Sequence, residues 1–306
     1  MPLFAITGIT GQVGGAAARR LLTAGASVRG VVRDAARGAP WREAGARVAV
    51  ANLDDASALA AAFDGADGVF IMTPSWGGSR DMFARNIRAI DALGVALRAV
   101  RPPRIVLLSS IGAQHPAGTG AILKLHRMEQ AFAGIAGVVS VRAGWFMENY
   151  AGLIPQVWAS GVLPSMLAPL DRAQPMVATQ DIGEAVATLL LSPEGGPSVI
   201  ELEGPRRYAP NDVATAFAEV LGRPVTAEIL PPSRWPAIYA QRGLTPRSAE
   251  AMAEMLAGFN SGHIAFETAD TVCSRTSLEA VLAAAERGPR PLRDHVASSC
   301  DRDVLV

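Results

Sequence analysis

Glycines near the start of the chain are its clearest candidates for chemistry. Gly8, Gly11 and Gly14 stand three apart, directly after the apolar run 3–7. A strand-to-helix turn this tight needs glycines, because a side chain would keep the backbone from approaching a ligand. A helix expected over residues 13–22 would aim its unpaired N–H groups and positive dipole end at that ligand. The pattern predicts a dinucleotide phosphate site; a turn that binds nothing is the alternative.

Arg33 follows the second predicted strand, residues 28–32. An acidic residue at this strand end would bind the 2′-hydroxyl of the NAD ribose. A guanidinium instead matches a 2′-phosphate in charge and in fork geometry. Arg33, with Arg37 nearby, therefore favours NADP(H) over NAD(H), the alternative being a solvated arginine at a strand end.

Two titratable side chains, Lys124 and His126, lie on a helix predicted over residues 122–133. Of the 28 basic residues, Lys124 is the only lysine, and lysine, unlike arginine, releases its proton at a reachable pH. A histidine titrates near neutral pH. Both are candidate catalytic proton donors. Lys124 is also a candidate for binding a ribose hydroxyl, and the alternative is that it is an ordinary exposed lysine. Since residues two apart on a helix face different ways, we expect only one at the site.

The elements that position these residues alternate along the first half of the chain. Apolar strands are predicted over residues 3–7, 28–32, 47–51, 68–72, 104–110 and 138–142, with helices such as 80–93 between them. Such alternation is typical of a parallel sheet covered by helices on both faces. The fold class predicted is α/β, a doubly wound parallel sheet.

The carboxyl ends of parallel strands border the ligand crevice. The residues expected to contact a dinucleotide there are Asn52, Leu53, Thr73, Pro74, Ser109, Gly144, Trp145 and Phe146. Asn52 or its backbone is a candidate for the adenine, and Ser109, with Ser110, for the nicotinamide. The aromatic pair after the sixth strand suits a stacking wall, with core packing as the alternative.

Three carboxylates have simpler expected roles. Asp54 or Asp55 is expected to cap the helix that follows it. Glu129 is expected to be a surface or capping partner for Arg127 or a neighbouring helix.

Composition narrows the class of protein. The chain has 306 residues and a formal net charge of +0, which gives no sign of a nucleic-acid or membrane-surface partner. Cys273 and Cys300 show no metal-ligand spacing, and no apolar run approaches the roughly 20 residues needed to cross a bilayer. The first strand begins almost at once, leaving no room for a signal peptide. We expect a cytoplasmic protein without a metal, and allow a homodimer.

Several stretches together resemble the NmrA-like group of atypical short-chain dehydrogenases/reductases, which includes NADPH-dependent quinone reductases and ergot-alkaloid-type reductases. The matching stretches are 7–14, 32–33, 142–150, 177–183 and 199–205, the last resembling a small-domain strand. The resemblance implies NADP(H) as cofactor and a Rossmann domain over residues 1–150, with a return segment near 176–204. It implies a smaller, mostly helical substrate domain and tail over residues 151–306. For the first stretch it implies cofactor contacts from Gly8, Thr10, Gly11, Gln12, Val13 and Gly14.

The chain departs from ordinary short-chain dehydrogenases at their Tyr-x-x-x-Lys pair, because position 120, four before Lys124, is Gly120. Trp235 and Tyr239 share a helix face, and an apolar stripe continues over residues 252–259. Most of that stripe is expected to be core, and any part that faces the crevice favours an apolar ligand.

These observations predict an NADPH-dependent reductase. It would transfer a hydride to a carbonyl, quinone, or conjugated or imine bond of a hydrophobic, aromatic small molecule. A non-catalytic NADP(H)-binding redox sensor is the alternative. An epimerase or dehydratase is a third, disfavoured by the missing catalytic tyrosine.

Overall fold

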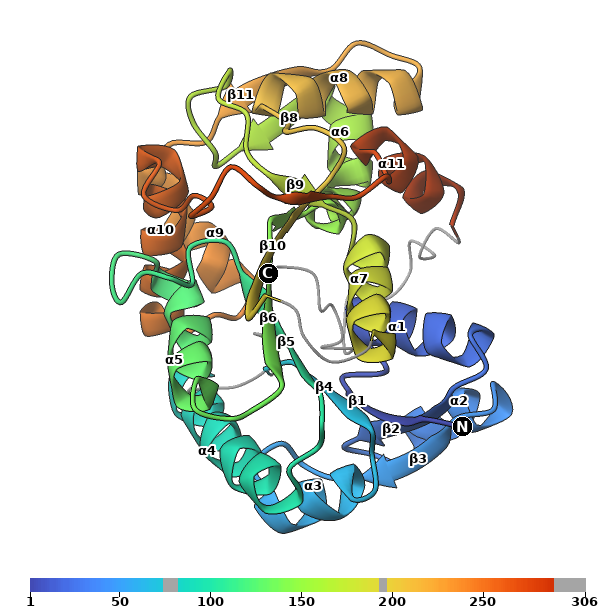
Figure 1. The fold of residues 1–306 in the computed structure, drawn as a ribbon. Coiled ribbons are helices and arrows are strands. Elements are labelled where there is room, and N and C mark those ends of the chain that lie inside the picture. The colour runs from blue at the N-terminus through green and yellow to red at the C-terminus, as the bar shows by residue number, and fades with distance from the viewer. Residues whose placement is uncertain (74–81, 193–196, 289–306) are drawn as a thin grey trace.

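The computed structural model describes residues 1–73, 82–192 and 197–288 (Figure 1). Among these residues, eight strands form one parallel sheet in the order β12-β10-β6-β5-β4-β1-β2-β3. Their bounds are β1 Leu3–Thr7, β2 Ser27–Val32, β3 Arg47–Val50, β4 Gly68–Ile71, β5 Ile105–Ser110, β6 Val138–Ala143, β10 Val199–Glu203 and β12 Val272–Cys273. The run β3-β2-β1-β4-β5-β6 is the strand order of a dinucleotide-binding fold. In this order the chain adds strands on one side of β1 and then, from β4 on, on its other side.

Helices cover both faces of the sheet. Helices α1 (Gln12–Thr23) and α7 (Thr179–Leu191) pack on one face with the strands' side chains. Helices α3 (Ala56–Phe63), α4 (Met82–Val100) and α5 (Leu123–Phe132) pack on the other. Every residue of β4 and β5 is buried, as the continuous apolar runs require of strands covered twice. The predicted doubly wound α/β fold is confirmed.

The second half of the chain builds a third core above the carboxyl edge of the sheet (Figure 1). It contains α6 (Ile154–Ser160), β8 (Val162–Ser165), α8 (Pro210–Leu221), β11 (Thr226–Ile229) and α11 (Leu278–Arg287). Two short parallel pairs, β8 with β11 and β7 (Trp145–Phe146) with β9 (Met176–Val177), complete this region. No helix in the described ranges has the length and apolarity needed to cross a membrane.

The strand at residues 199–205 carried two expectations. It resembled a small-domain strand, while the return segment near 176–204 was expected in the Rossmann domain. In the structure β10 pairs with β6 and β12 pairs with β10, so this strand belongs to the central sheet and not to the smaller region. The register places Glu201 opposite Arg142. This pairing of opposite charges favours β10 at that edge and is invisible in the local pattern of either strand. A boundary near residue 150 remains a prediction.

Candidate functional site

The turn between β1 and α1 has the geometry that its glycines predict. Gly8 adopts a φ of +63°, which side chains rarely tolerate, and the Gly11 N–H donates to the Gly8 carbonyl at 2.9 Å. A Cβ at Gly14 would lie 2.3 Å from the Gly8 oxygen, and one at Gly8 would lie 2.2 Å from Met72 Sδ. Gly14 is required because the helix packs directly on the backbone of the turn, and Gly8 is favoured because of its positive φ.

Helix α1 begins with an open N-terminus. The N-cap residue of α1 is Gly11, which has no side chain to cap the helix. The first turn of α1 holds no acidic residue. The neighbouring Thr10 and Gln12 are exposed. The N–H groups at this end and the helix dipole favour an anion, so the turn fits the diphosphate of a dinucleotide.

Thr7 ties this turn to the neighbouring strand. It belongs to the stretch 7–14, but no contact was predicted for it. Its hydroxyl donates to the Phe70 carbonyl at 3.0 Å and accepts from the Met72 N–H at 3.0 Å. The bonds join β1 to β4 at the point where the strand order reverses. Thr73 is buried just beyond, while Pro74 lies outside the described residues.

Arg33 stands exposed directly after β2. The next residue, Asp34, accepts a hydrogen bond from the Ala36 N–H at 2.9 Å, so its carboxylate is occupied in a local turn. Arg33 and the exposed Arg37 therefore supply positive charge at the strand end where a 2′-phosphate would lie.

The turn after β3 places Asn52 at the surface and Leu53 half-buried against the core. Asp55 accepts from the Ala58 N–H at 2.9 Å and caps α3. The capping prediction is confirmed for Asp55, and a contact of the exposed Asn52 with an adenine stays a prediction.

The two candidate proton donors point apart, as their spacing predicts. Lys124 is only 6% exposed and lines a small pocket with Phe83 and Ile90 of α4. Burial lowers the pKa of its ammonium to about 8. The alternative of an exposed helix lysine is therefore wrong.

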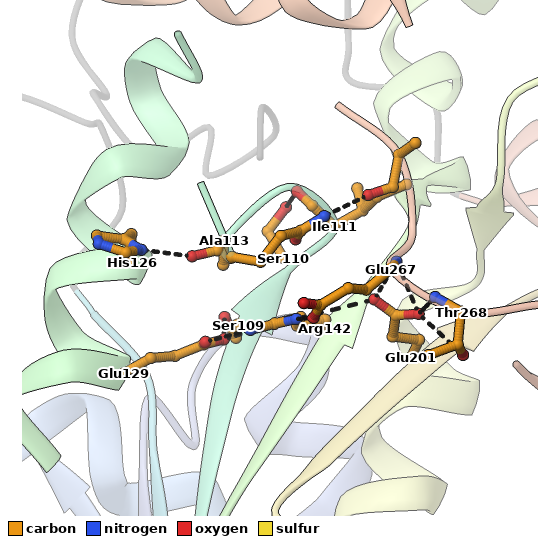
Figure 2. Close-up of polar contacts among 12 residues, drawn as sticks. Ser109, Ser110, Ile111, Ala113, His126, Glu129, Arg142, Glu201, Glu267 and Thr268 are labelled. Atoms are coloured by element: carbon orange, nitrogen blue, oxygen red, sulfur yellow. Dashed lines mark hydrogen bonds and ion pairs between the residues drawn. The ribbon is translucent and has the colours of Figure 1, made fainter. Parts of the chain in front are cut away.

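His126 faces the loop that follows β5. Its Nδ1 lies 2.8 Å from the Ala113 carbonyl oxygen (Figure 2). A carbonyl only accepts, so Nδ1 carries a proton in this contact. His126 thus fastens the loop to α5.

Ser109 and Ser110 are buried at the end of β5. Ser109 donates to Glu129 at 2.5 Å and Ser110 donates to the Ile111 carbonyl at 3.1 Å. Both hydroxyls have protein partners in this state, and a nicotinamide contact from Ser109 stays a prediction.

Glu129 differs from its expected surface role. Its carboxylate is 9% exposed and accepts two bonds from Arg142, at 3.1 and 2.8 Å. Arg142 also donates to Glu267 at 2.5 Å, and Glu201 accepts from the Glu267 and Thr268 N–H groups (Figure 2). The signal for this cluster was present as charges inside the apolar strands β6 and β10.

The segment after β6 forms a wall between two parts of the molecule. A Cβ at Gly144 would lie 2.7 Å from the Pro175 oxygen, so glycine lets β7 meet β9. Trp145 packs edge-on against Phe259 of α10 (Pro246–Ser261), with ring centroids 5.3 Å apart. Phe146 packs on the α1 and α7 side. Core packing is thus part of the role of both aromatic residues.

The predicted apolar stripe belongs to the core. Trp235 and Tyr239 of α9 (Trp235–Gln241) are buried with Met252, Met255 and Phe259, in the same cluster as α4 and α5. The expectation that most of the stripe is core is confirmed.

Family models match both halves of the chain. Residues 8–143 match a family described as NAD(P)H-binding, and residues 132–284, half of the 306-residue chain, match the NmrA-like family. The first match covers the glycine turn and confirms NAD(P)H as the cofactor, while the individual contact residues stay predictions.

Curated relatives match over most of their length. An NAD(P)H azoreductase of Xenophilus azovorans is 26% identical over 255 residues, covering 82% of this chain and 85% of the relative. Quinone oxidoreductase 2 of Escherichia coli K12 is 26% identical over 265 residues, covering 85% and 89%.

Solved structures share the fold. An Escherichia coli NADPH-dependent quinone oxidoreductase, complexed with NADPH, matches with a TM-score of 0.76 at 22% identity, over 92% of this chain and 98% of that one. A Citrobacter sp. triphenylmethane reductase complexed with NADP(H) matches with a TM-score of 0.77 at 18% identity, over 92% and 99%.

Proposed function

The chain belongs to the NmrA-like family, and on that premise we propose that it is an NADPH-dependent reductase of small hydrophobic molecules. The proposed acceptors are carbonyl, quinone, and conjugated or imine bonds in aromatic compounds. The observation that carries the proposal is the open N-terminus of α1 behind a turn that admits only glycine at residue 14 and favours it at residue 8. A cytoplasmic location and a homodimer belong to the same proposal.

The chain's own residues have distinct roles in this reaction. The bound cofactor supplies the hydride. The turn at Gly8–Gly14 and the first N–H groups of α1 hold the diphosphate, and Arg33 pairs with the 2′-phosphate. Lys124 gives its proton to the substrate atom that becomes negative, which balances the hydride. An ammonium with a pKa of about 8 is protonated at neutral pH and releases that proton readily.

Two kinds of observation support the substrate class. Trp145 and Phe146 follow the carboxyl end of β6 and are only partly buried, so they can offer aromatic surface to a bound molecule. The curated relatives are named for azo and quinone reduction. An electron-poor, conjugated, aromatic substrate fits both.

The test is oxidation of NADPH with quinones, azo dyes, aromatic ketones and cyclic imines. We expect turnover with at least one class, reduced about 100-fold in Lys124→Ala with NADPH affinity unchanged, because general acid catalysis contributes on that scale. His126→Ala and the exposed Arg127→Ala should stay near wild type. A collapse in His126→Ala instead would move the proton donor to that residue.

A redox sensor is the second candidate, because the tyrosines are not placed to act as the catalytic tyrosine of ordinary short-chain dehydrogenases. Tyr208 is buried in the third core and accepts from the Leu278 N–H, while Tyr239 packs in the first. Neither of them lies on α5 with Lys124, and Tyr150, in the short helix Met147–Leu153, does not either. Tight NADP(H) binding without turnover, and a strong preference between the oxidised and reduced cofactor, would establish this candidate and reject the reductase.

Arg33 tests the choice of cofactor. Arg33→Ala should weaken NADPH binding at least about tenfold, as loss of a charge-assisted phosphate contact does, and leave NADH binding unchanged. Titration of nucleotide fluorescence measures both. Arg20→Ala, an exposed arginine in the last turn of α1, is the control. Equal weakening of both nucleotides would place Arg33 away from the 2′-phosphate.

A further inference from the structure

Gln12, the first residue of α1, contacts a helix that lies far away in the sequence. Its Oε1 lies 3.1 Å from the hydroxyl of Thr179, the first residue of α7. The same hydroxyl lies 2.7 Å from a carboxylate oxygen of Glu148, which also accepts from the Thr179 N–H at 2.9 and 3.1 Å. The hydroxyl has a single proton, so the Gln12 and Glu148 oxygens share one donor. The three side chains form one connected group.

Helices α1 and α7 begin side by side, but only the N-terminus of α7 is capped by a side chain. Close packing holds them together, since a Cβ at Gly183 would lie 2.4 Å from the Ala16 Cβ. The N-terminus of α7 is closed by the Glu148 carboxylate, which suits the positive end of a helix dipole. The N-terminus of α1 is left without a side-chain cap from Gly11. An anion therefore meets free N–H groups at α1 and a carboxylate at α7.

Thr179 joins these two ends. It is 5% exposed, whereas Gln12 is exposed. A long exposed amide at the first turn of α1 would sample many rotamers. Contact with a buried hydroxyl, itself fixed by a carboxylate, restricts that freedom next to the open N–H groups.

We propose that Thr179 and Glu148 are positioning residues for the dinucleotide: they hold the Gln12 side chain against α7 and keep the first turn of α1 ready for the diphosphate. The inference rests on the proposed function, because it assumes that the diphosphate binds at this turn. It adds that the segment returning from the second half of the chain prepares the cofactor site.

The same helix carries a matched pair for control. Asp181 accepts from the Thr276 N–H at 2.9 Å and from the Thr276 hydroxyl at 2.6 Å. This pair has the same chemistry as Glu148 with Thr179, but it ties α7 to the chain before α11 and not to Gln12. Thr276→Val therefore removes an equivalent hydroxyl without touching the dinucleotide turn.

The experiment measures NADPH dissociation constants by fluorescence titration, together with KM and kcat. Loss of one hydrogen bond corresponds to about threefold to tenfold in affinity. We expect Thr179→Val to raise Kd and KM for NADPH by that factor with kcat unchanged. Thr179→Ser, which keeps the hydroxyl, and Thr276→Val should stay within about twofold of wild type.

A double substitution tests the route through Gln12. If Thr179 acts through the Gln12 side chain, the double variant Gln12→Ala with Thr179→Val should bind NADPH no more weakly than Gln12→Ala alone. Three results would overturn this inference and leave the proposed function standing. They are additive losses of NADPH affinity in the double variant, an unchanged Kd in Thr179→Val, and an equal loss of affinity in Thr276→Val. Failure of the wild-type protein to bind NADPH would overturn the proposed function and this inference with it.

Discussion

Lys124 shows how position changes the chemistry of a single residue. On an exposed helix face its ammonium would keep a pKa near 10.5, but burial between α4 and α5 lowers that pKa to about 8. Burial raises the free energy of the charged form, because the ammonium loses its water. The same change that makes Lys124 a usable acid also costs stability at neutral pH.

This cost predicts a pH-dependent effect of Lys124→Met. The pKa is about 8 in the folded protein and near 10.5 when unfolded, so between these values the unfolded chain binds more protons and stability rises with pH. Below pH 8 the variant should be more stable than wild type by up to about 3 kcal/mol, since each pKa unit is worth about 1.4 kcal/mol. Near pH 10.5 that advantage should vanish.

Urea unfolding of both proteins at several pH values measures the difference. Arg127→Met, at an exposed position of the same helix, should show a difference that does not vary with pH. A constant difference for Lys124→Met as well would show that the Lys124 pKa is not lowered.

At the scale of elements, the contact between α1 and α7 joins the two halves of the chain. Gly183 lies against Ala16 and Ala17, with no room for a side chain, since a Cβ would come within 2.4 Å of the first and 2.7 Å of the backbone nitrogen of the second. Helix α1 lies close to its predicted bounds, residues 13–22. The partnership of α1 and α7 comes from small residues on both.

Gly183→Ala should therefore push the helices apart, destabilising the protein by about 1–3 kcal/mol as overpacking does and weakening NADPH binding. Chemical unfolding and nucleotide titration measure the two effects. Gly134→Ala is the control, because nothing lies within 4 Å of the added Cβ. If both variants keep wild-type stability, the contact between α1 and α7 is looser than the structure has it.

At the scale of the whole molecule, the Arg142 cluster joins α5, β5, β6, β10 and the segment after α10. Arg142 is 7% exposed at its side chain and faces Glu129, Glu201 and Glu267. A buried arginine with several carboxylates holds these elements in one arrangement. It also fixes the helix that carries both candidate proton donors.

Arg142→Met should destabilise the protein by about 3–5 kcal/mol, because removing one partner leaves buried carboxylates uncompensated. Arg206→Met is the matched control. Arg206 also pairs with two carboxylates, but its side chain is 49% exposed, so its loss should cost about 1 kcal/mol or less. Equal losses measured by urea unfolding would show that burial does not set the strength of the cluster.

The sequence by itself determined the parts of this protein that short-range physics fixes. The glycine turn, the order of strands and helices, the Asp55 cap and the arginine after β2 all follow from residues close together in the chain. Glycine conformation, apolar periodicity and helix capping act over a few residues, so a local pattern is enough to predict them.

Only the tertiary structure decided which distant residues meet. It buried Lys124, paired Glu129 with Arg142, placed β10 and β12 on the central sheet, and set Thr179 beside Gln12, 167 positions away. Strand register and helix packing bring such residues together, and both depend on the whole core closing at once. The sequence marks some of these residues as unusual, but their chemistry comes from their neighbours in space.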